Sequence, residues 1–104
     1  MHIIKLQETE TQGVFSLSEE SFVFKEGRVQ GAKLGKSGGA LLVKEAERFK
    51  LFSEGKDFLK ILEGNGYFKW KKGEIPFASG ECFEIQAAGE YEVNGSPKFL
   101  VVRK

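Results

Sequence analysis

The chain has 104 residues, and its 16 Lys and Arg residues nearly balance its 15 Asp and Glu residues, leaving a net charge of +1. This length predicts a single domain over residues 1–104 with one modest core. Nucleic-acid binders usually carry a basic excess or stripe, so we expect no nucleic-acid partner. Because no apolar run reaches the roughly 20 residues of a membrane span and the start turns polar too soon for a secretory signal, we expect a soluble, cytoplasmic protein with no membrane partner.

The chain contains one histidine, His2, and one cysteine, Cys82. A lone cysteine cannot form an internal disulfide, which fits a reducing compartment. Too few Cys and His ligands are present for a zinc site, and a Ser-His-Asp triad would depend on a histidine beside the N-terminus. We therefore expect no metal and no cofactor, and we assign no catalytic residue. Cys82 is expected to be a small core residue rather than a nucleophile.

The first half alternates short apolar runs with turn residues. Strands are predicted over residues 3–6, 14–17, 22–24 and 29–30. Residues 35–39 lack the full spacing of a phosphate-binding loop and are expected to form a mobile loop. Residues 40–49 contain helix formers, so a short helix stays open, but we favour two strands broken near Glu45 because the neighbouring runs all predict strands.

The second half predicts strands over residues 57–62, 67–70, 74–77, 82–85, 91–93 and 98–102. The Asn65-Gly66 pair marks a tight turn, and Pro76 indicates a strand start or an edge strand. A loop is expected at Ala87, Ala88 and Gly89, and residues 94–97 are expected to close a hairpin between the last two strands. Short strands with regular turn signals between them predict an all-β sandwich or barrel.

Four glycine-based segments follow in order along the second half: LEGNG at residues 62–66, GEIP at 73–76, GECFEI at 80–85 and GEY at 89–91. This series resembles the cupin superfamily and is most similar to the cupin-like C-terminal domain of class I mannose-6-phosphate isomerases. The resemblance covers residues 57–102 by motif and residues 22–52 by general pattern. It implies a small double-stranded β-helix, a jelly-roll barrel of two packed sheets.

The resemblance also implies where a metal-binding cupin would hold its ion. The family's carboxylate position falls on Asp57 and its last histidine position on Tyr91. The other two histidine positions fall on one of two pairs, Lys50 and Phe52 or Leu51 and Ser53. None of these positions holds an imidazole or a thiolate, the ligands that borderline transition metals prefer. In the isomerases catalysis belongs to a separate zinc-binding domain, so the resemblance does not carry the isomerase reaction to this chain.

Strand alternation decides whether these positions form a pocket. One register turns Arg48, Lys50 and Phe52 into the barrel, where they would form a cationic pocket for a small anionic ligand such as a sugar phosphate. The other register turns Phe49, Leu51 and Ser53 inward, and we favour it because buried Lys and Arg side chains need partners. The candidate pocket residues are Lys50, Phe52, Asp57, Glu84 and Tyr91.

Two aromatic residues have a structural and a functional interpretation. Tyr91 is expected to pack its ring and bond a loop carbonyl rather than anchor a ligand. Trp70, beside Lys69, Lys71 and Lys72, is expected to be a half-buried strand end rather than a stacking platform.

The ten Phe residues exceed what one small barrel interior readily holds. Apolar outer faces, formed by Phe58 and Leu62 or by Phe49 and Leu51, therefore predict a homodimer. Residues 3–6 are a candidate for an exchanged strand. We favour a metal-free binding or interaction module. The alternatives are a metal-independent sugar-phosphate binder or isomerase-like enzyme, and a structural subunit that acts only in a complex.

Overall fold

A computed structural model describes residues 2–11, 13–86 and 89–103 of the chain. Within them, seven strands form the larger sheet: β1 (His2–Lys5), β2 (Val23–Phe24), β3 (Lys33–Ser37), β4 (Ala40–Lys44), β6 (Lys56–Glu63), β9 (Cys82–Gln86) and β11 (Lys98–Arg103). Four more form the smaller sheet: β5 (Arg48–Ser53), β7 (Gly66–Trp70), β8 (Gly73–Phe77) and β10 (Gly89–Asn94). Two short 3-10 helices, η1 (Glu8–Thr11) and η2 (Glu19–Ser21), complete the described elements. No helix in these described ranges has the length and apolar character to cross a membrane.

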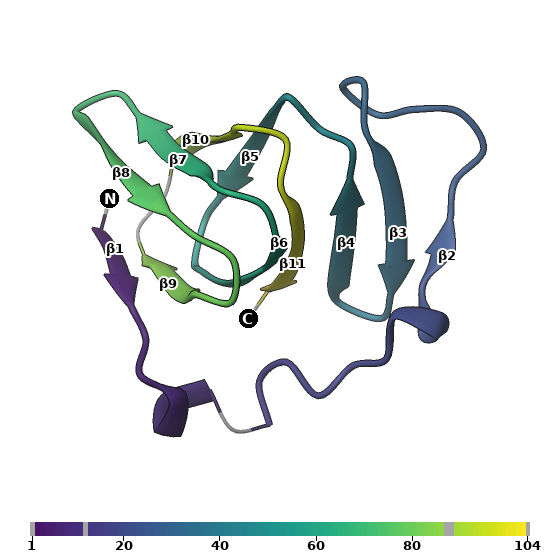
Figure 1. Cartoon of the computed structure of the whole chain (residues 1–104), viewed down its shortest axis with the longest axis horizontal. Coiled ribbons are helices and arrows are strands. Elements are labelled where there is room, and N and C mark those ends of the chain that lie inside the picture. The colour runs from purple at the N-terminus through teal and green to yellow at the C-terminus, as the bar shows by residue number, and fades with distance from the viewer. Residues whose placement is uncertain (1, 12, 87–88, 104) are drawn as a thin grey trace.

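The large sheet runs in the order β1-β9-β6-β11-β4-β3-β2, and the small sheet in the order β5-β10-β7-β8 (Figure 1). All pairings of neighbouring strands are antiparallel. The all-β prediction is confirmed, and the arrangement is consistent with a cupin-like barrel. The two sheets do not close into one continuous ladder, so the barrel is open.

The main core lies between the two sheets and is rich in aromatic residues. Phe68 packs against Phe77 and Phe83 with ring centroids 4.8 and 5.0 Å apart. Strand alternation supplies this core, because every second side chain of β5 and of β6 is buried. Phe49, Leu51 and Ser53 point inward and their neighbours point outward, which confirms the favoured register.

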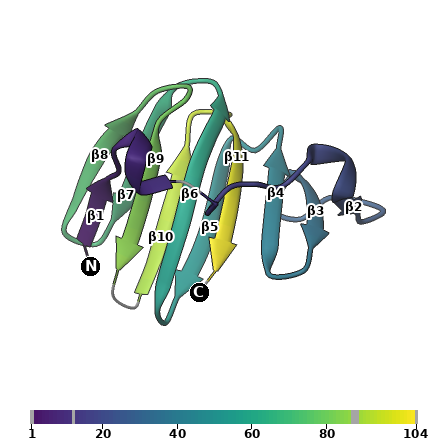
Figure 2. The same cartoon turned by 90° about the horizontal axis from the view of Figure 1, so that it is seen from below.

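A second apolar cluster lies on the outer face of the large sheet, where Leu42 and Leu100 are buried. The chain itself covers this face, because the segment between β1 and β2 crosses it (Figure 2). Phe15 and Phe22 of this segment pack against the cluster. An ion pair of 2.7 Å between Lys98 Nζ and Glu19 Oε1 joins the covering segment to β11. The apolar outer face expected at Leu62 is therefore partly covered within one chain.

Most of the predicted strands are present, including all six of the second half. The two-strand interpretation of residues 40–49 is also confirmed: β4 ends at Lys44, and Glu45 turns the chain with a φ of 60°. Pro76 lies on β8, which is an edge strand as expected. The expected loop positions Ala87 and Ala88 lie outside the described residues, and Gly89 begins β10.

Four local predictions are wrong. Residues 14–17 form no strand, because Phe15 is used to cover the large sheet. Residues 29–30 contribute only an isolated bridge from Val29 to Ala32. Residues 35–37 are part of β3 rather than of a loop, and only Gly38 and Gly39 form the turn to β4. Residues 94–97 close no hairpin, because β10 belongs to the small sheet and β11 to the large one.

Candidate functional site

Two of the predicted pocket residues, Asp57 and Tyr91, meet between the sheets. The Tyr91 hydroxyl donates a hydrogen bond of 2.7 Å to Asp57 Oδ2, and the two residues are 0% and 2% exposed. The other carboxylate oxygen, Oδ1, lies 3.6 Å from Nε of Arg103 on β11. Tyr91 is therefore packed as expected, but its hydroxyl bonds a carboxylate rather than a loop carbonyl.

The surroundings of Tyr91 keep its hydroxyl protonated. Burial raises the pKa of Tyr91 above its ordinary value, and the neighbouring Asp57 carboxylate raises it further. Both causes disfavour a phenolate, by desolvation and by repulsion from a like charge. At neutral pH Tyr91 is thus a hydrogen-bond donor that satisfies a buried carboxylate.

The positions that the cupin resemblance assigns to a metal do not fit one. Asp57 already accepts from Tyr91 and faces the positive charge of Arg103. Of the two inward positions on β5, Leu51 offers no donor atom, and the Ser53 hydroxyl bonds the Gly55 carbonyl. In the ranges that the structure describes, no three His, Cys, Asp or Glu side chains are grouped to hold an ion. The interior polar residues therefore satisfy one another instead of forming a ligand set.

The other three pocket candidates lie elsewhere. Lys50 and Phe52 point to the outer face of the small sheet, away from Asp57. Glu84 lies on β9 between the buried residues Phe83 and Ile85, so it points to the outer face of the large sheet. Its carboxylate accepts a hydrogen bond from the Gln86 amide. The structure thus brings together Asp57 and Tyr91 but not the five residues as one pocket.

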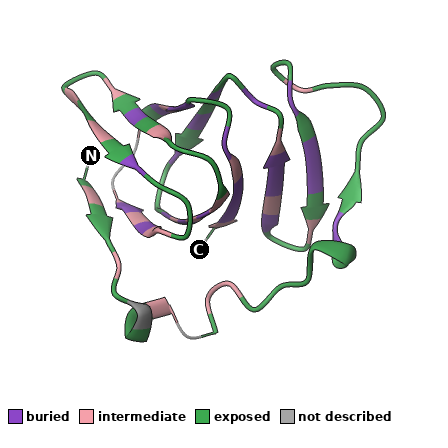
Figure 3. Cartoon of the chain, in the orientation of Figure 1, coloured by how far each residue is buried: buried purple, intermediate pink, exposed green. Residues whose placement is uncertain are grey.

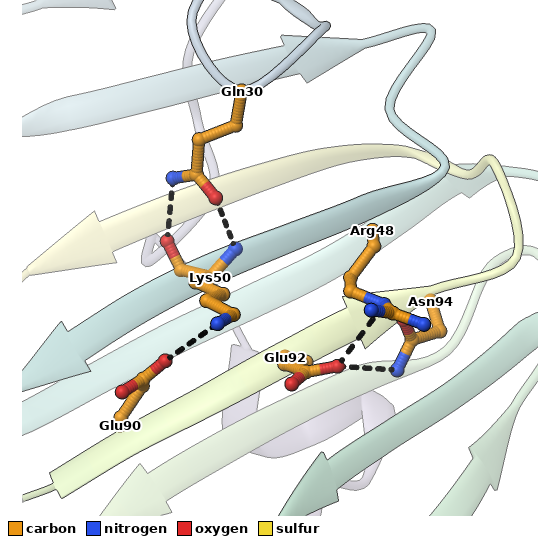
Figure 4. A network of polar contacts seen from close by, with 6 residues as sticks. All are labelled: Gln30, Arg48, Lys50, Glu90, Glu92 and Asn94. Carbon is orange, nitrogen blue, oxygen red and sulfur yellow. Dashed lines mark hydrogen bonds and ion pairs between the residues drawn. The ribbon is translucent and has the colours of Figure 1, made fainter.

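The outer face of the small sheet carries a network of charged side chains (Figure 4). Arg48 pairs with Glu92 and Lys50 pairs with Glu90, each at 3.5 Å. Asn94 also donates to Glu92, at 3.4 Å. Exposed pairs of this kind add little stability, typically about 0–1 kcal/mol each, so their main effect is on the surface that the sheet presents.

The free edge of β5 is covered by one side chain. The Gln30 amide donates to the Lys50 carbonyl at 2.9 Å and accepts from the Lys50 N–H at 2.8 Å (Figure 4). These are the two bonds that a residue of a neighbouring strand would make. Sequence reasoning missed Gln30 and Arg103, because each acts on a residue far along the chain and neither lies in a recognisable motif.

A surface hollow of about 700 Å³ lies at the turn between β7 and β8, beside β10. Lys69, Trp70, Lys71 and Lys72 line one side of it, and Glu90 lies on the other. Trp70 is half-buried against the core and the three lysines are exposed, as predicted. Over the described residues, these lysines have no carboxylate within ion-pair distance. The hollow is open, and its lining combines these lysines and the Trp70 ring with the carboxylates of Glu90 and Glu92.

Hydrolytic or nucleophilic chemistry finds little support in the rest of the structure. Cys82 is partly buried, and burial raises the pKa of its thiol, which disfavours the reactive thiolate. The thiol is therefore poorly suited to act as a nucleophile at neutral pH. The Cys82 side chain is half-buried, whereas the sequence predicted a small core residue.

The comparisons with known proteins show a shared fold. Neither a protein-family profile nor a curated protein sequence matches the chain. Mannose 6-phosphate isomerase from Bacillus subtilis is similar in structure, with a TM-score of 0.65 and 12% identity over 86% of this chain. The chain spans only 31% of that isomerase.

Two further solved structures match over nearly their whole length. Drosophila melanogaster CENP-C, solved bound to CAL1, has a TM-score of 0.59 and 14% identity over 92% of this chain and 91% of that one. A protein of unknown function from Vibrio parahaemolyticus has a TM-score of 0.56 and 14% identity over 79% of this chain and 97% of that one. At these identities the likenesses establish the fold alone.

Proposed function

We propose that this chain is a metal-free, cupin-like interaction module that forms a homodimer and binds partners through its outer surface. The observation that carries this proposal is that packed side chains fill the interior, where the Tyr91 hydroxyl donates a hydrogen bond to Asp57 among aromatic rings. Within the described residues no buried side-chain nitrogen or oxygen lacks a hydrogen-bond partner, so these groups are already satisfied before any substrate binds. The similarity to CENP-C, a domain of comparable length solved with a protein partner, supports an interaction role.

The dimer surface in this proposal is the outer face of the small sheet. Across its four strands, the pairing places Lys50, Glu92, Lys69 and Glu74 opposite one another in a row. A two-fold axis parallel to the strands would reverse this row in the second copy, so each lysine would face a glutamate. Phe52, 56% exposed, and Tyr67, 40% exposed, add apolar area to the same face. Self-complementarity is what a symmetric dimer requires.

Sedimentation velocity over a range of concentrations tests the dimer. The unmodified chain is expected to sediment as a dimer and Phe52→Glu as a monomer, because the new carboxylate would lie in the contact. Val23→Glu is the matched control, since Val23 is an exposed apolar residue of the other sheet. A monomeric mass for the unmodified chain, or a dimer that survives Phe52→Glu, would refute this surface.

A second candidate function is binding of a sugar phosphate, which the three lysines of the β7–β8 hollow favour, because they form no ion pair within the described chain. The structural similarity to a mannose 6-phosphate isomerase gives the probe, mannose 6-phosphate. At 100 times its dissociation constant a ligand adds about 2.7 kcal/mol, or roughly 10 °C or more in melting temperature. A shift that disappears in Lys71→Glu/Lys72→Glu would establish this function. A shift with Zn²⁺ or Mn²⁺ would contradict the metal-free assignment.

A further inference from the structure

The edge strand β2 presents unpaired backbone groups at one end of the large sheet (Figure 1). Val23 lies opposite Lys36 and Phe24 opposite Gly35, and the Lys25 N–H donates to the Leu34 carbonyl at 3.1 Å. Antiparallel strands turn their backbone groups alternately toward and away from the partner. Because the Lys25 N–H is hydrogen-bonded to β3, the N–H and C=O of the preceding residue, Phe24, point away from β3 and toward the open edge.

Two other edges of the fold are protected against strand addition. Gln30 covers β5, and Pro76 on β8 has no N–H to donate. Proteins commonly protect edges in such ways. The β2 edge has neither device, and both of its residues are exposed (Figure 3). Val23, at 75%, is the most exposed large apolar residue of the described chain.

Cationic side chains surround a hollow of about 490 Å³ beside this edge. Phe24 and four cations line it: Lys25, Arg28, Lys33 and Lys44. The Lys44 ammonium lies 4.7 Å from the centre of the Phe24 ring. Glu45 is the acidic residue that pairs here, at 3.6 Å from Arg28 and 3.0 Å from Lys33. Lys25 and Lys44 have no carboxylate partner within the described chain, so the hollow has a positive excess.

The two faces of the edge differ in chemistry. Lys44 lies opposite Lys33 and two residues from the outward-facing Leu42, so both lysines and Phe24 share the outer face. Val23 points to the opposite face, because successive strand residues alternate. Lys36, the exposed cross-strand partner of Val23, shares that face. A strand added at β2 would therefore meet Lys33 and Lys44 on one face, and Val23 beside Lys36 on the other.

We propose that the β2 edge docks an extended segment of a partner protein as an additional strand, and that this segment alternates acidic and apolar residues. Its carboxylates would lie among the four cations, and its apolar side chains would cover Val23. Its backbone would form hydrogen bonds with the N–H and C=O of Phe24. A second copy of this chain does not fit, because pairing two β2 edges would bring two cationic hollows together. The inference concerns a different sheet from the dimer surface and does not depend on it.

Fluorescence anisotropy with a labelled peptide of alternating Glu and Val tests the docking. We expect saturable binding below about 1 mM, at least tenfold weaker for Lys25→Glu/Lys44→Glu and for Val23→Glu. Lys56→Glu/Lys60→Glu makes the same charge change on β6, which three strands separate from β2 in the large sheet, and binding should stay within twofold. A peptide of alternating Lys and Val should not bind. The Phe52→Glu variant should bind normally, which separates failure of this proposal from failure of the dimer.

Amide hydrogen exchange distinguishes strand addition from loose attraction between charges. With the Glu–Val peptide bound, exchange of the Phe24 amide should slow at least tenfold, whereas the Lys5 amide on the β1 edge should not change. Absence of saturable binding, equal loss of binding in both charge-reversal variants, or an unprotected Phe24 amide would overturn the proposal. Displacement of the peptide by single-stranded DNA at equal charge concentration would also overturn it, since a general polyanion site would then explain the cations.

Discussion

Replacement of Tyr91 by phenylalanine tests the central feature of the interior, the hydrogen bond to Asp57. The substitution keeps the ring and removes only the hydroxyl, so the packing of the core is retained. It leaves Asp57 Oδ2, which is buried, without the donor that lies at 2.7 Å in the unmodified protein. The expected result is a loss of folding stability without a change of fold.

The size of this loss follows from the burial of both partners. A hydrogen bond to a charged group contributes about 1.5–3 kcal/mol, and a buried acceptor left unpaired has a similar cost. Arg103 lies 3.6 Å from the other oxygen and is partly exposed, so it compensates only in part. We therefore expect a decrease of about 2 kcal/mol in the free energy of unfolding, or roughly 10 °C in the melting temperature.

Urea denaturation followed by circular dichroism measures the change, and the chain provides a matched control. Tyr67, the other tyrosine, is 40% exposed, and Tyr67→Phe should alter stability by less than about 0.5 kcal/mol. The double variant Tyr91→Phe/Asp57→Asn should lose less than the sum of its two single changes, because the residues interact directly. A Tyr91→Phe protein as stable as the unmodified one would refute the role given to this bond.

Three further predictions concern pH, the sheet edge and chain packing. The folded state raises the pKa of Tyr91, whereas an unfolded tyrosine ionises at about 10. The free energy of unfolding should therefore stay constant below that pH and fall above it by about 1.4 kcal/mol per pH unit. Urea titrations at several pH values measure this slope, which Tyr91→Phe should remove. Gln30→Ala uncovers the β5 edge and should produce larger assemblies than the unmodified chain forms, by light scattering at high protein concentration. Gly66→Ala should destabilise by about 3 kcal/mol in urea, because its Cβ would collide with the Asn94 carbonyl oxygen, whereas Gly39→Ala, whose Cβ would have 3.9 Å of clearance, should cost less than about 1 kcal/mol.

Local signals were sufficient for the strands of the second half but not for the pairing of those strands. Glycine and asparagine mark where each strand ends, and alternation marks which side chains are buried. The last two strands were nevertheless predicted as a hairpin, although β10 pairs with β5 and β7 while β11 pairs with β4 and β6. A turn motif reports that the chain reverses, and it does not report which distant strand becomes the neighbour.

The first half shows how tertiary packing overrides a local pattern. Residues 14–17 alternate like a strand, yet Phe15 packs over the outer face of the large sheet. Gly35 suggested a loop but lies within β3. Its role there is steric, because a Cβ at this position would lie 3.0 Å from the Phe24 ring and 3.2 Å from Phe22 Cβ. The absence of a side chain at Gly35 leaves room on the sheet for the Phe24 ring and the Phe22 side chain.

The candidate site was predictable by position and not by contact. The resemblance placed Asp57 among the interior metal positions, and the cost of burying Lys and Arg favoured the register that turns Lys50 outward; the structure has Asp57 buried and Lys50 exposed. The resemblance placed Asp57 and Tyr91 in one site, but their hydrogen bond joins two facing sheets across 34 positions of sequence, and the strand patterns do not report that contact. The contacts of Gln30 and the cations around β2 depend equally on tertiary placement.

The interior bond and the outer surfaces together favour a binding role outside the barrel. A ligand that displaced the Tyr91–Asp57 hydrogen bond would incur a cost of about 2 kcal/mol, which lowers affinity roughly thirtyfold. No such cost applies at the outer face of the small sheet or at the β2 edge, where charged and apolar groups are already exposed. These two surfaces belong to different sheets, so a dimer formed through the first would leave the second free on each copy. Such a dimer would present two identical peptide-docking edges, and a partner with two acidic segments would bind it more tightly than a partner with one.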